Sequence, residues 1–269
     1  MSNQSHSLTV RPVRAFADNY IWLIESPAAL GSVVAVDPGD AAPVADELRR
    51  SGSSLAAILL THHHPDHIGG VAGLLGLGKV PVIAPADARI PLHTRTVHDN
   101  ERCDLPELGL GFDILAVPGH TLSHIAFWGH GALFSGDTLF SAGCGRMFEG
   151  TPTQMTSSLT RLRALPAETR VFCGHEYTLA NLRFALAVEP ANRSVIEHRD
   201  ALERQRAADS PAELTPSLPS TLELETRINP FLRCDVPAVR AAAEARAGRS
   251  LPEPKDVFAV LRGWKDQFR

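Results

Sequence analysis

The residues best suited to chemistry lie in one stretch, residues 61–70, with the sequence Thr-His-His-His-Pro-Asp-His-Ile-Gly-Gly. It follows an apolar run at residues 55–60 that is typical of a buried strand. Four of its side chains are candidate metal ligands: His62, His64, Asp66 and His67. In an extended backbone the first two point the same way and can reach one ion, while the last two follow the bend at the proline and can reach another. Because neutral imidazole and carboxylate bind zinc, iron and manganese, the stretch predicts a metal site.

Three further candidate ligands stand at the ends of apolar runs. In each case a glycine precedes the ligand, which lets the chain turn sharply and presents the next side chain at the rim of a sheet. Sites in α/β proteins lie at such strand ends. The three residues are His120, Asp137 and His175. Each of them taken alone could instead be a polar strand end with a structural role.

Seven ligands are too many for one tetrahedral ion and suit two. To the first ion we assign His62, His64 and His120, to the second Asp66, His67 and His175, and to both Asp137 as a bridge. Two ions about 3.5 to 4 Å apart can share a hydroxide, because metal binding lowers the pKa of water. Asp66 and Asp137 are then the catalytic carboxylates, and this hydroxide is the nucleophile. We expect two divalent ions per chain, zinc first, with iron and manganese as alternatives.

The composition excludes several classes of protein. The net charge is −4, so no basic field attracts nucleic acid or anionic lipid. No apolar run reaches the length of a membrane span, and the polar residues 1–7 do not resemble a secretory signal. The four cysteines are scattered, as in reduced cytosolic proteins. We therefore expect a cytoplasmic monomer that acts on a small molecule.

The elements that must position these ligands follow an α/β pattern as far as residue 177. Strands are expected at residues 20–25, 32–37, 55–60, 80–84, 111–117, 124–128, 132–135 and 170–173, and helices at 42–50, 68–77 and 153–165. Residues 85–110 give no clear pattern. From residue 178 the chain is mostly helical, with helices expected at 182–188, 194–207 and 236–247. The sequence thus predicts an α/β domain over residues 1–177 and a helical domain over residues 178–269.

These motifs resemble those of a known family. The histidine stretch is similar to the signature of the metallo-β-lactamase superfamily, and other segments look like glyoxalase II. The latter segments are Gly136-Asp137-Thr138-Leu139-Phe140, Ala142-Gly143-Cys144-Gly145-Arg146, Cys173-Gly174-His175-Glu176-Tyr177-Thr178, Asn229-Pro230-Phe231 and Lys265-Asp266-Gln267-Phe268. The resemblance implies an αβ/βα four-layer sandwich followed by a helical domain that contributes to glutathione binding. It also implies hydrolysis of the thioester S-(R)-lactoylglutathione to glutathione and D-lactate, in the detoxification of methylglyoxal.

The resemblance also implies a set of glutathione contacts. The matching positions are Arg146, Phe148, Tyr177, Arg262 and Lys265. Phe148 stands where the family usually has a tyrosine, so one hydroxyl donor is absent. For the two C-terminal basic residues the alternative is a solvated helix face.

Three other functions are compatible with parts of the pattern. An iron-dependent oxygenase of glutathione persulfide shares the fold and needs only a triad of two histidines and one carboxylate, whereas this sequence offers ligands for two ions. A nuclease or phosphodiesterase of the superfamily would require a basic tract that the sequence lacks. A non-catalytic metal-binding module would not need the residues that match a substrate clamp.

Overall fold

The structure, a computed structural model, describes residues 8–210 and 214–268. The polar segment 1–7, residues 211–213 and the last residue of the predicted helical domain lie outside the described residues. The chain forms two compact units. Unit 1 comprises Met1–Val117, Ser123–Gly136 and Phe172–His175, and unit 2 comprises Pro118–Leu122, Asp137–Val171 and Glu176–Arg269.

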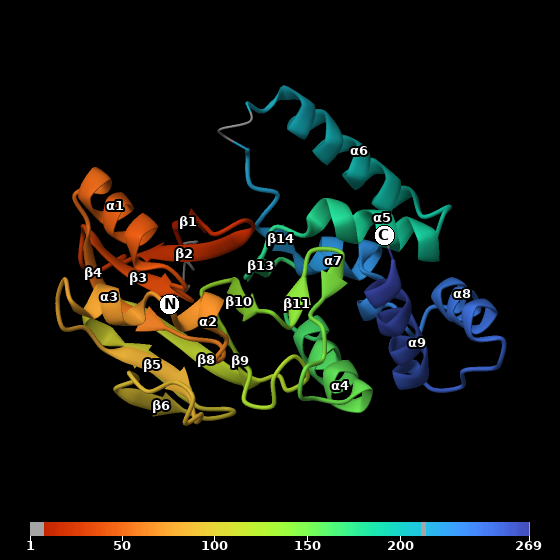
Figure 1. Cartoon of the computed structure of the whole chain (residues 1–269), viewed down its shortest axis with the longest axis horizontal. Coiled ribbons are helices and arrows are strands. Elements are labelled where there is room, and N and C mark those ends of the chain that lie inside the picture. Colours follow the sequence, from red (N-terminus) through yellow and green to blue (C-terminus); the bar gives the residue numbers. More distant parts are fainter. Residues whose placement is uncertain (1–7, 211–213, 269) are drawn as a thin grey trace, which may run out of the picture. The chain divides into compact units, whose positions relative to one another are not determined.

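Unit 1 contains two sheets and the helices that cover one of them (Figure 1). The first sheet has the strand order β1-β2-β3-β4-β5-β6, antiparallel from β1 to β3 and parallel from β3 to β6. Its elements are β1 (Val10–Ala15), β2 (Asn19–Glu25), β3 (Ser32–Val36), α1 (Ala41–Ser51), β4 (Ser54–Leu59), α2 (Pro65–Ile68), α3 (Val71–Leu75), β5 (Val82–Pro85) and β6 (Arg95–Val97). The second sheet holds β7 (Arg102–Leu105), β8 (Leu110–Ala116), β9 (Ile125–Gly129) and β10 (Ala132–Gly136), with the 3₁₀ turn η1 (Pro106–Leu108) between β7 and β8. The end of β13 (Arg170–Cys173) lies next to β10.

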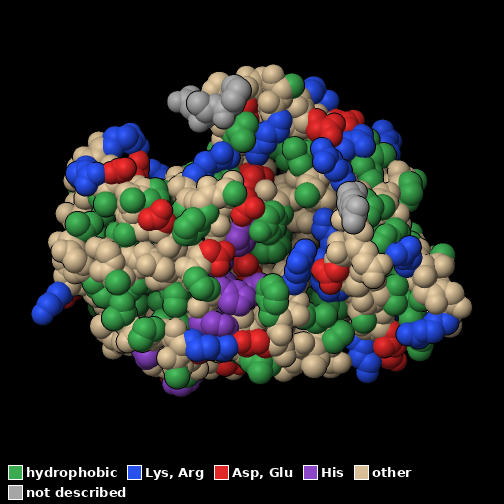
Figure 2. Space-filling model, in the orientation of Figure 1, with side chains coloured by type: hydrophobic (Ala, Val, Ile, Leu, Met, Phe, Trp, Pro, Cys, Tyr) green, Lys and Arg blue, Asp and Glu red, His purple; other side chains and the backbone are tan. Residues whose placement is uncertain are grey.

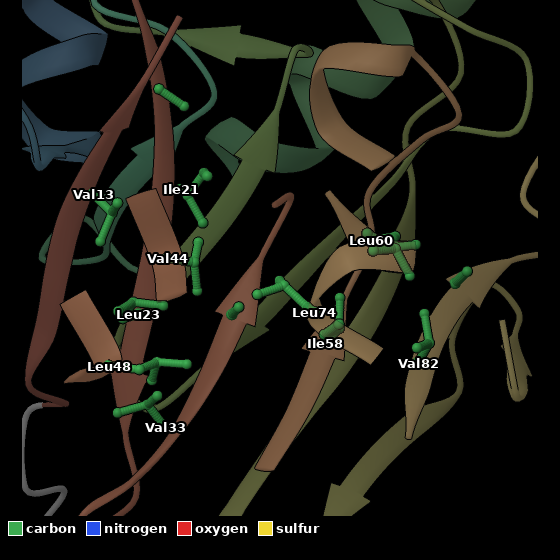
Figure 3. Packing of buried hydrophobic residues seen from close by; sticks show 14 of the residues in the cluster. Val13, Ile21, Leu23, Val33, Val44, Leu48, Ile58, Leu60, Leu74 and Val82 are labelled. Carbon is green, nitrogen blue, oxygen red and sulfur yellow. The ribbon is translucent and has the colours of Figure 1, made fainter. Parts of the chain in front are cut away.

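Alternating side chains of β2 explain why these layers stack. Ile21 and Leu23 belong to the apolar cluster that α1 and α3 share with the first sheet (Figure 3). Trp22 lies on the other face, where its ring meets Phe172 at 5.0 Å, and Phe172 in turn stacks on Phe134 at 5.1 Å. The strand is therefore buried on both faces, which favours a continuous apolar run.

Unit 2 is mostly helical, as the sequence predicted for residues after 178. Its elements are β11 (Leu139–Phe140), β12 (Gly143–Cys144), α4 (Pro152–Arg163), α5 (Thr178–Val188), α6 (Arg193–Ala208), β14 (Ser220–Thr221), α7 (Leu222–Ile228), the 3₁₀ turn η2 (Pro230–Leu232), α8 (Pro237–Ala247) and α9 (Pro254–Gln267). Helix α4 begins with a capping box, in which Thr151 and Gln154 satisfy each other's backbone N–H groups, and with a proline at its first position. The two sheets and the helices together confirm the predicted α/β fold class.

One predicted helix is wrong in its extent. Residues 68–77 form no single helix, because α2 ends at Ile68 and α3 begins at Val71. A side chain at position 70 would lie 2.5 Å from the carbonyl carbon of Asp40. The backbone N–H of Gly70 donates to Pro38 O at 2.9 Å. The paired glycines let the chain pass this close to the 38–41 turn, a contact that local periodicity does not reveal.

Other parts of the chain differ from the prediction or leave it open. Strand β1 was not predicted, and the unassigned residues 85–110 contain β6, β7 and η1. Of the helices in the described ranges, none is long and apolar enough to cross a membrane. The two compact units do not follow the division at residues 177 and 178, which stays a prediction.

Candidate metal centre

Unit 1 brings three of the predicted ligands together. Asp66 and His67 lie in the single turn α2, and His175 follows the end of β13. Their ligand atoms all lie within 4.8 Å of one another. The Nε2 atoms of His67 and His175 lie 3.6 and 3.4 Å from Oδ2 of Asp66. In Figure 2 histidine and acidic side chains meet at the surface in the region of α2.

The other ring nitrogen of each histidine is held by a second aspartate. Nδ1 of His67 lies 3.0 Å from Oδ2 of Asp37, and Nδ1 of His175 lies 2.8 Å from Oδ1 of Asp18. A carboxylate accepts, so each Nδ1 carries the proton and each Nε2 of the neutral ring presents its lone pair to Asp66. Two lone pairs and a carboxylate oxygen that face one another repel unless a cation lies between them. The donor set therefore fits a divalent metal ion.

Asp37 also fixes the ring of His62. The Thr61 hydroxyl donates to Oδ2 of Asp37 at 2.7 Å, so towards Nδ1 of His62, at 3.0 Å, its oxygen can only accept. The Thr61 N–H donates to the other carboxylate oxygen at 2.8 Å. The Nε2 atom of His62 is thereby left as the ligand atom, and the ring of His64 lies beside it with 4.7 Å between centroids.

Asp37 and Asp18 are not among the residues predicted from the sequence. Asp37 lies within 4.8 Å of the ligand atoms of His62 and His67, but it already accepts three hydrogen bonds and is best described as the residue that orients them. It follows the apolar strand β3 and precedes Pro38-Gly39, so the pattern of a strand followed by an acid could have found it. Asp18 has no such signal in its surroundings.

Unit 2 brings the other two strand-end ligands together. The Nε2 atom of His120 lies 3.5 Å from Oδ2 of Asp137, and both side chains are buried. His120 donates from Nδ1 to the backbone carbonyl of Arg146 at 2.8 Å, so its Nε2 also carries the lone pair. A side chain at Gly145 would lie 2.0 Å from the carbonyl oxygen of Asp137, so only glycine allows this close return of the chain.

The seven predicted ligands are thus divided between the two units. Unit 1 holds His62, His64, Asp66, His67 and His175, and unit 2 holds His120 and Asp137. The assignments that combine residues of both units stay predictions.

The predicted glutathione contacts all belong to unit 2. Arg262 is 5% exposed, so the alternative of a solvated helix face is wrong for this residue. Its guanidinium donates to Cys144 O at 2.9 Å and to Oδ1 of Asp266 at 3.0 Å. Arg146 also lies near Asp266, with Nε 3.6 Å from Oδ1. Lys265 donates to Ala180 O at 3.0 Å. Burial and the charges of the two arginines lower the pKa of Lys265 to about 8.

The two aromatic residues of this set differ in exposure. Phe148 is 65% exposed, and its ring lies 5.3 Å from that of His120. Tyr177 precedes α5 and is half-buried, with its ring perpendicular to that of Phe140 at 5.3 Å.

Comparison with known proteins accounts for almost all of the described chain. Residues 17–175 match the model of the "Metallo-beta-lactamase superfamily", and residues 176–268 match "Hydroxyacylglutathione hydrolase C-terminus". The hydroxyacylglutathione hydrolase of Alkalilimnicola ehrlichii is 54% identical and covers 95% of this chain and 97% of its own. That of Pseudomonas fluorescens is 50% identical and covers 97% of this chain and 100% of its own. A solved structure described as TTHA1623 in a di-iron-bound form is 28% identical, with a TM-score of 0.59 over 82% of this chain and 99% of that one.

Proposed function

Because the chain belongs to the hydroxyacylglutathione hydrolases of the metallo-β-lactamase superfamily, we propose that it hydrolyses S-(R)-lactoylglutathione to glutathione and D-lactate. The observation that carries the proposal is the set of oriented acceptors around Asp66, which fits a divalent metal ion. The glutathione thioester comes from the names of the relatives.

We propose that the seven ligands hold two divalent ions in the arrangement expected from the sequence, with Asp137 as the bridge. Zinc is the first choice, and the di-iron form of the similar structure makes iron the next. When bound, such ions lower the pKa of water towards neutrality and polarise a carbonyl group. Monomeric state and cytoplasmic location stay predictions.

The residues of the chain supply orientation and substrate binding. Asp18 keeps the proton of the His175 ring on Nδ1 and Asp37 does the same for His67, so these two ligand atoms need no rearrangement. We propose that Arg146 and Lys265 bind a carboxylate of the glutathione moiety, far from the thioester carbon. Binding energy at that distance positions the carbonyl for attack. Because two N–H groups of Arg262 are already bonded, we propose that it contributes charge and anchors Asp266.

The leaving group makes a general acid unnecessary. A thiol with a pKa of about 8.5 leaves readily as thiolate. No side chain of the site therefore has to donate a proton to the sulfur.

Steady-state kinetics with metal analysis test the proposed function. We expect lactoylglutathione to be hydrolysed with a kcat/KM at least about 10-fold above that of a thioester without the glutathione carboxylates, because a hydrogen bond to a charged group contributes about 1.5–3 kcal/mol. Two ions per chain should be present in the active protein. Oxygen uptake with glutathione persulfide, and no thioester hydrolysis, would instead identify an oxygenase.

The lowered pKa of Lys265 predicts how KM depends on pH. Lys265 is charged below about pH 8 and loses its proton as the pH rises through that value. The carboxylates of glutathione stay ionised over this range, so we expect KM to rise above pH 8 while kcat changes less. In Lys265→Arg the charge persists, so KM should not change with pH over this range. In Lys265→Met KM should be higher than in wild type and should likewise not change with pH. A wild-type KM that is constant from pH 7 to 9.5 would remove Lys265 from substrate binding.

A further inference from the structure

A short hairpin in unit 2 joins Asp137 to Arg146. It is formed by β11 and β12, and after it the Gly145 N–H donates to Thr138 O at 3.3 Å. At the next residue, the carbonyl oxygen of Arg146 accepts a hydrogen bond from Nδ1 of His120. The hairpin thus determines where two candidate ligands lie: it returns the chain against the backbone of Asp137 and holds the ring of His120.

The tip of this hairpin rests on a buried carboxylate. Glu225, in α7, is fully buried, and its Oε1 accepts from the Ser141 hydroxyl at 2.8 Å and from the Ser220 hydroxyl. Its Oε2 accepts from the Ala142 N–H at 2.7 Å and from Nδ2 of Asn229 at 3.2 Å. Burial raises the pKa of Glu225, and the four hydrogen bonds oppose that shift.

Asn229 forms a second connection to the same hairpin. Its Nδ2 lies 3.1 Å from Phe140 O and 2.9 Å from Gly143 O, so one amide group contacts both strands. Asn181, which lies in α5, donates from Nδ2 to Ser141 O at 3.0 Å. Ala142 itself has a φ of +53°, a conformation that costs energy in a residue with a side chain and that needs such fixed partners to persist.

We propose that Glu225, together with Asn229, is a positioning residue that fixes the β11–β12 hairpin and, through it, Asp137 and His120. The consequence for metal binding rests on the proposed function. The order of the hairpin itself does not, because these hydrogen bonds are formed by the chain alone.

Two substitutions of Glu225 separate shape from charge. In Glu225→Gln the amide oxygen can accept from Ala142 and Asn229, and the amide N–H₂ can donate to the two serine hydroxyls, which accept as well as donate. In Glu225→Asp the charge stays but the side chain is one methylene shorter and cannot reach all four donors. A positioning role therefore predicts that Gln is tolerated and Asp is not.

The experiment measures amide hydrogen exchange at Ala142 and Gly145 in the metal-free protein, and zinc affinity by competition with a chelator. We expect Glu225→Asp and Glu225→Ala to exchange at least about 10-fold faster at both amides and to bind zinc about 10- to 100-fold more weakly, as for residues that orient ligands. Glu225→Gln should stay within about threefold of wild type in both measurements. If Glu225→Ala does not fold, Asn229→Ala provides the same test, because it removes the hydrogen bonds of Asn229 to the two hairpin strands.

Val239→Ala, a cavity-forming change in α8, controls for lost stability. It is compared with a Glu225 variant that has the same denaturation midpoint. Val239→Ala should bind zinc as tightly as wild type, and its hairpin amides should exchange no faster than the other amides of unit 2. The proposal is overturned if the Glu225 variants merely match Val239→Ala, or if Asp is tolerated and Gln is not. A protein that shows the expected exchange pattern yet hydrolyses no glutathione thioester would retain the positioning role and lose the proposed function.

Discussion

Asp137→Asn is expected to lower kcat/KM for lactoylglutathione by at least about 10³-fold, and Asp137→Ala by as much or more. The carboxylate of Asp137 is buried beside Nε2 of His120 at 3.5 Å, and in the proposed arrangement it supplies one oxygen to each ion. The amide of asparagine has nearly the same shape but carries no charge and only one oxygen. Both ions should therefore be bound more weakly, and metal analysis of the purified variant should give fewer than two per chain.

Asp46→Asn is the matched control for this change. Asp46 lies on α1 with 70% of its side chain exposed, in a surface pair with Arg49. Exposed pairs of this kind contribute little, so activity and metal content should equal those of wild type. If Asp137→Asn kept full activity with two bound ions, the bridging role would be wrong.

The candidate ligands could be predicted from the sequence because their signal is local. Each of the histidines and aspartates in question follows an apolar run, and the strand, the turn and the ligand are neighbours in the chain. The helical character of the chain after residue 178 is visible for the same reason, since periodicity is also a local property.

The contacts of the residues that orient the ligands could not be predicted, because the two partners of each contact are distant in the sequence. Asp37 is 30 residues from His67, and Asp18 is 157 residues from His175. Glu225 likewise lies 83 residues from Ala142. A single aspartate or glutamate in a sequence carries no sign of such a contact, and its usual location is the surface.

The burial of Arg262 was hidden for a related reason. A basic residue on an amphipathic helix is usually solvated, and α9 has such a pattern. Here the guanidinium lies over the ring of Phe231 at 5.2 Å and is bonded to Cys144 and Asp266. Only the tertiary contacts show that its cost of burial is offset.

The second large effect is expected for Asp37→Asn, which should weaken zinc binding by about 10- to 100-fold. The Thr61 N–H can only donate, so the amide oxygen of the substituted side chain must face it, and the amide N–H₂ then points at the Thr61 hydroxyl and at Nδ1 of His67. Nδ1 must become an acceptor, and the proton of the neutral ring moves to Nε2. The lone pair that faces Asp66 is thereby lost, although every hydrogen bond of Asp37 has a replacement.

The backbone does not confound this substitution. Asp37 has a φ of +51°, a conformation that asparagine tolerates as well as aspartate. Asp37→Ala, by contrast, leaves three buried donors without an acceptor at about 1–3 kcal/mol each, so it should also lower the free energy of unfolding of the metal-free protein by several kcal/mol. The Asn variant therefore isolates the effect on the tautomer from the effect on stability.

Chelator competition gives the zinc affinity, and ¹⁵N chemical shifts of the imidazole rings in the metal-free protein report which nitrogen of His67 is protonated. Asp87→Asn provides the control, because the Asp87 side chain is only 5% exposed and also lies beside a histidine. Its Oδ2 is 3.4 Å from Nδ1 of His63, which is not a predicted ligand. Its zinc affinity should stay within about threefold of wild type, since no coordinating ring changes its tautomer. If Asp37→Asn bound zinc as tightly as Asp87→Asn while its His67 remained protonated on Nδ1, the carboxylate would not be what sets the ligand atom, and the orientation of the ring would have to come from packing alone.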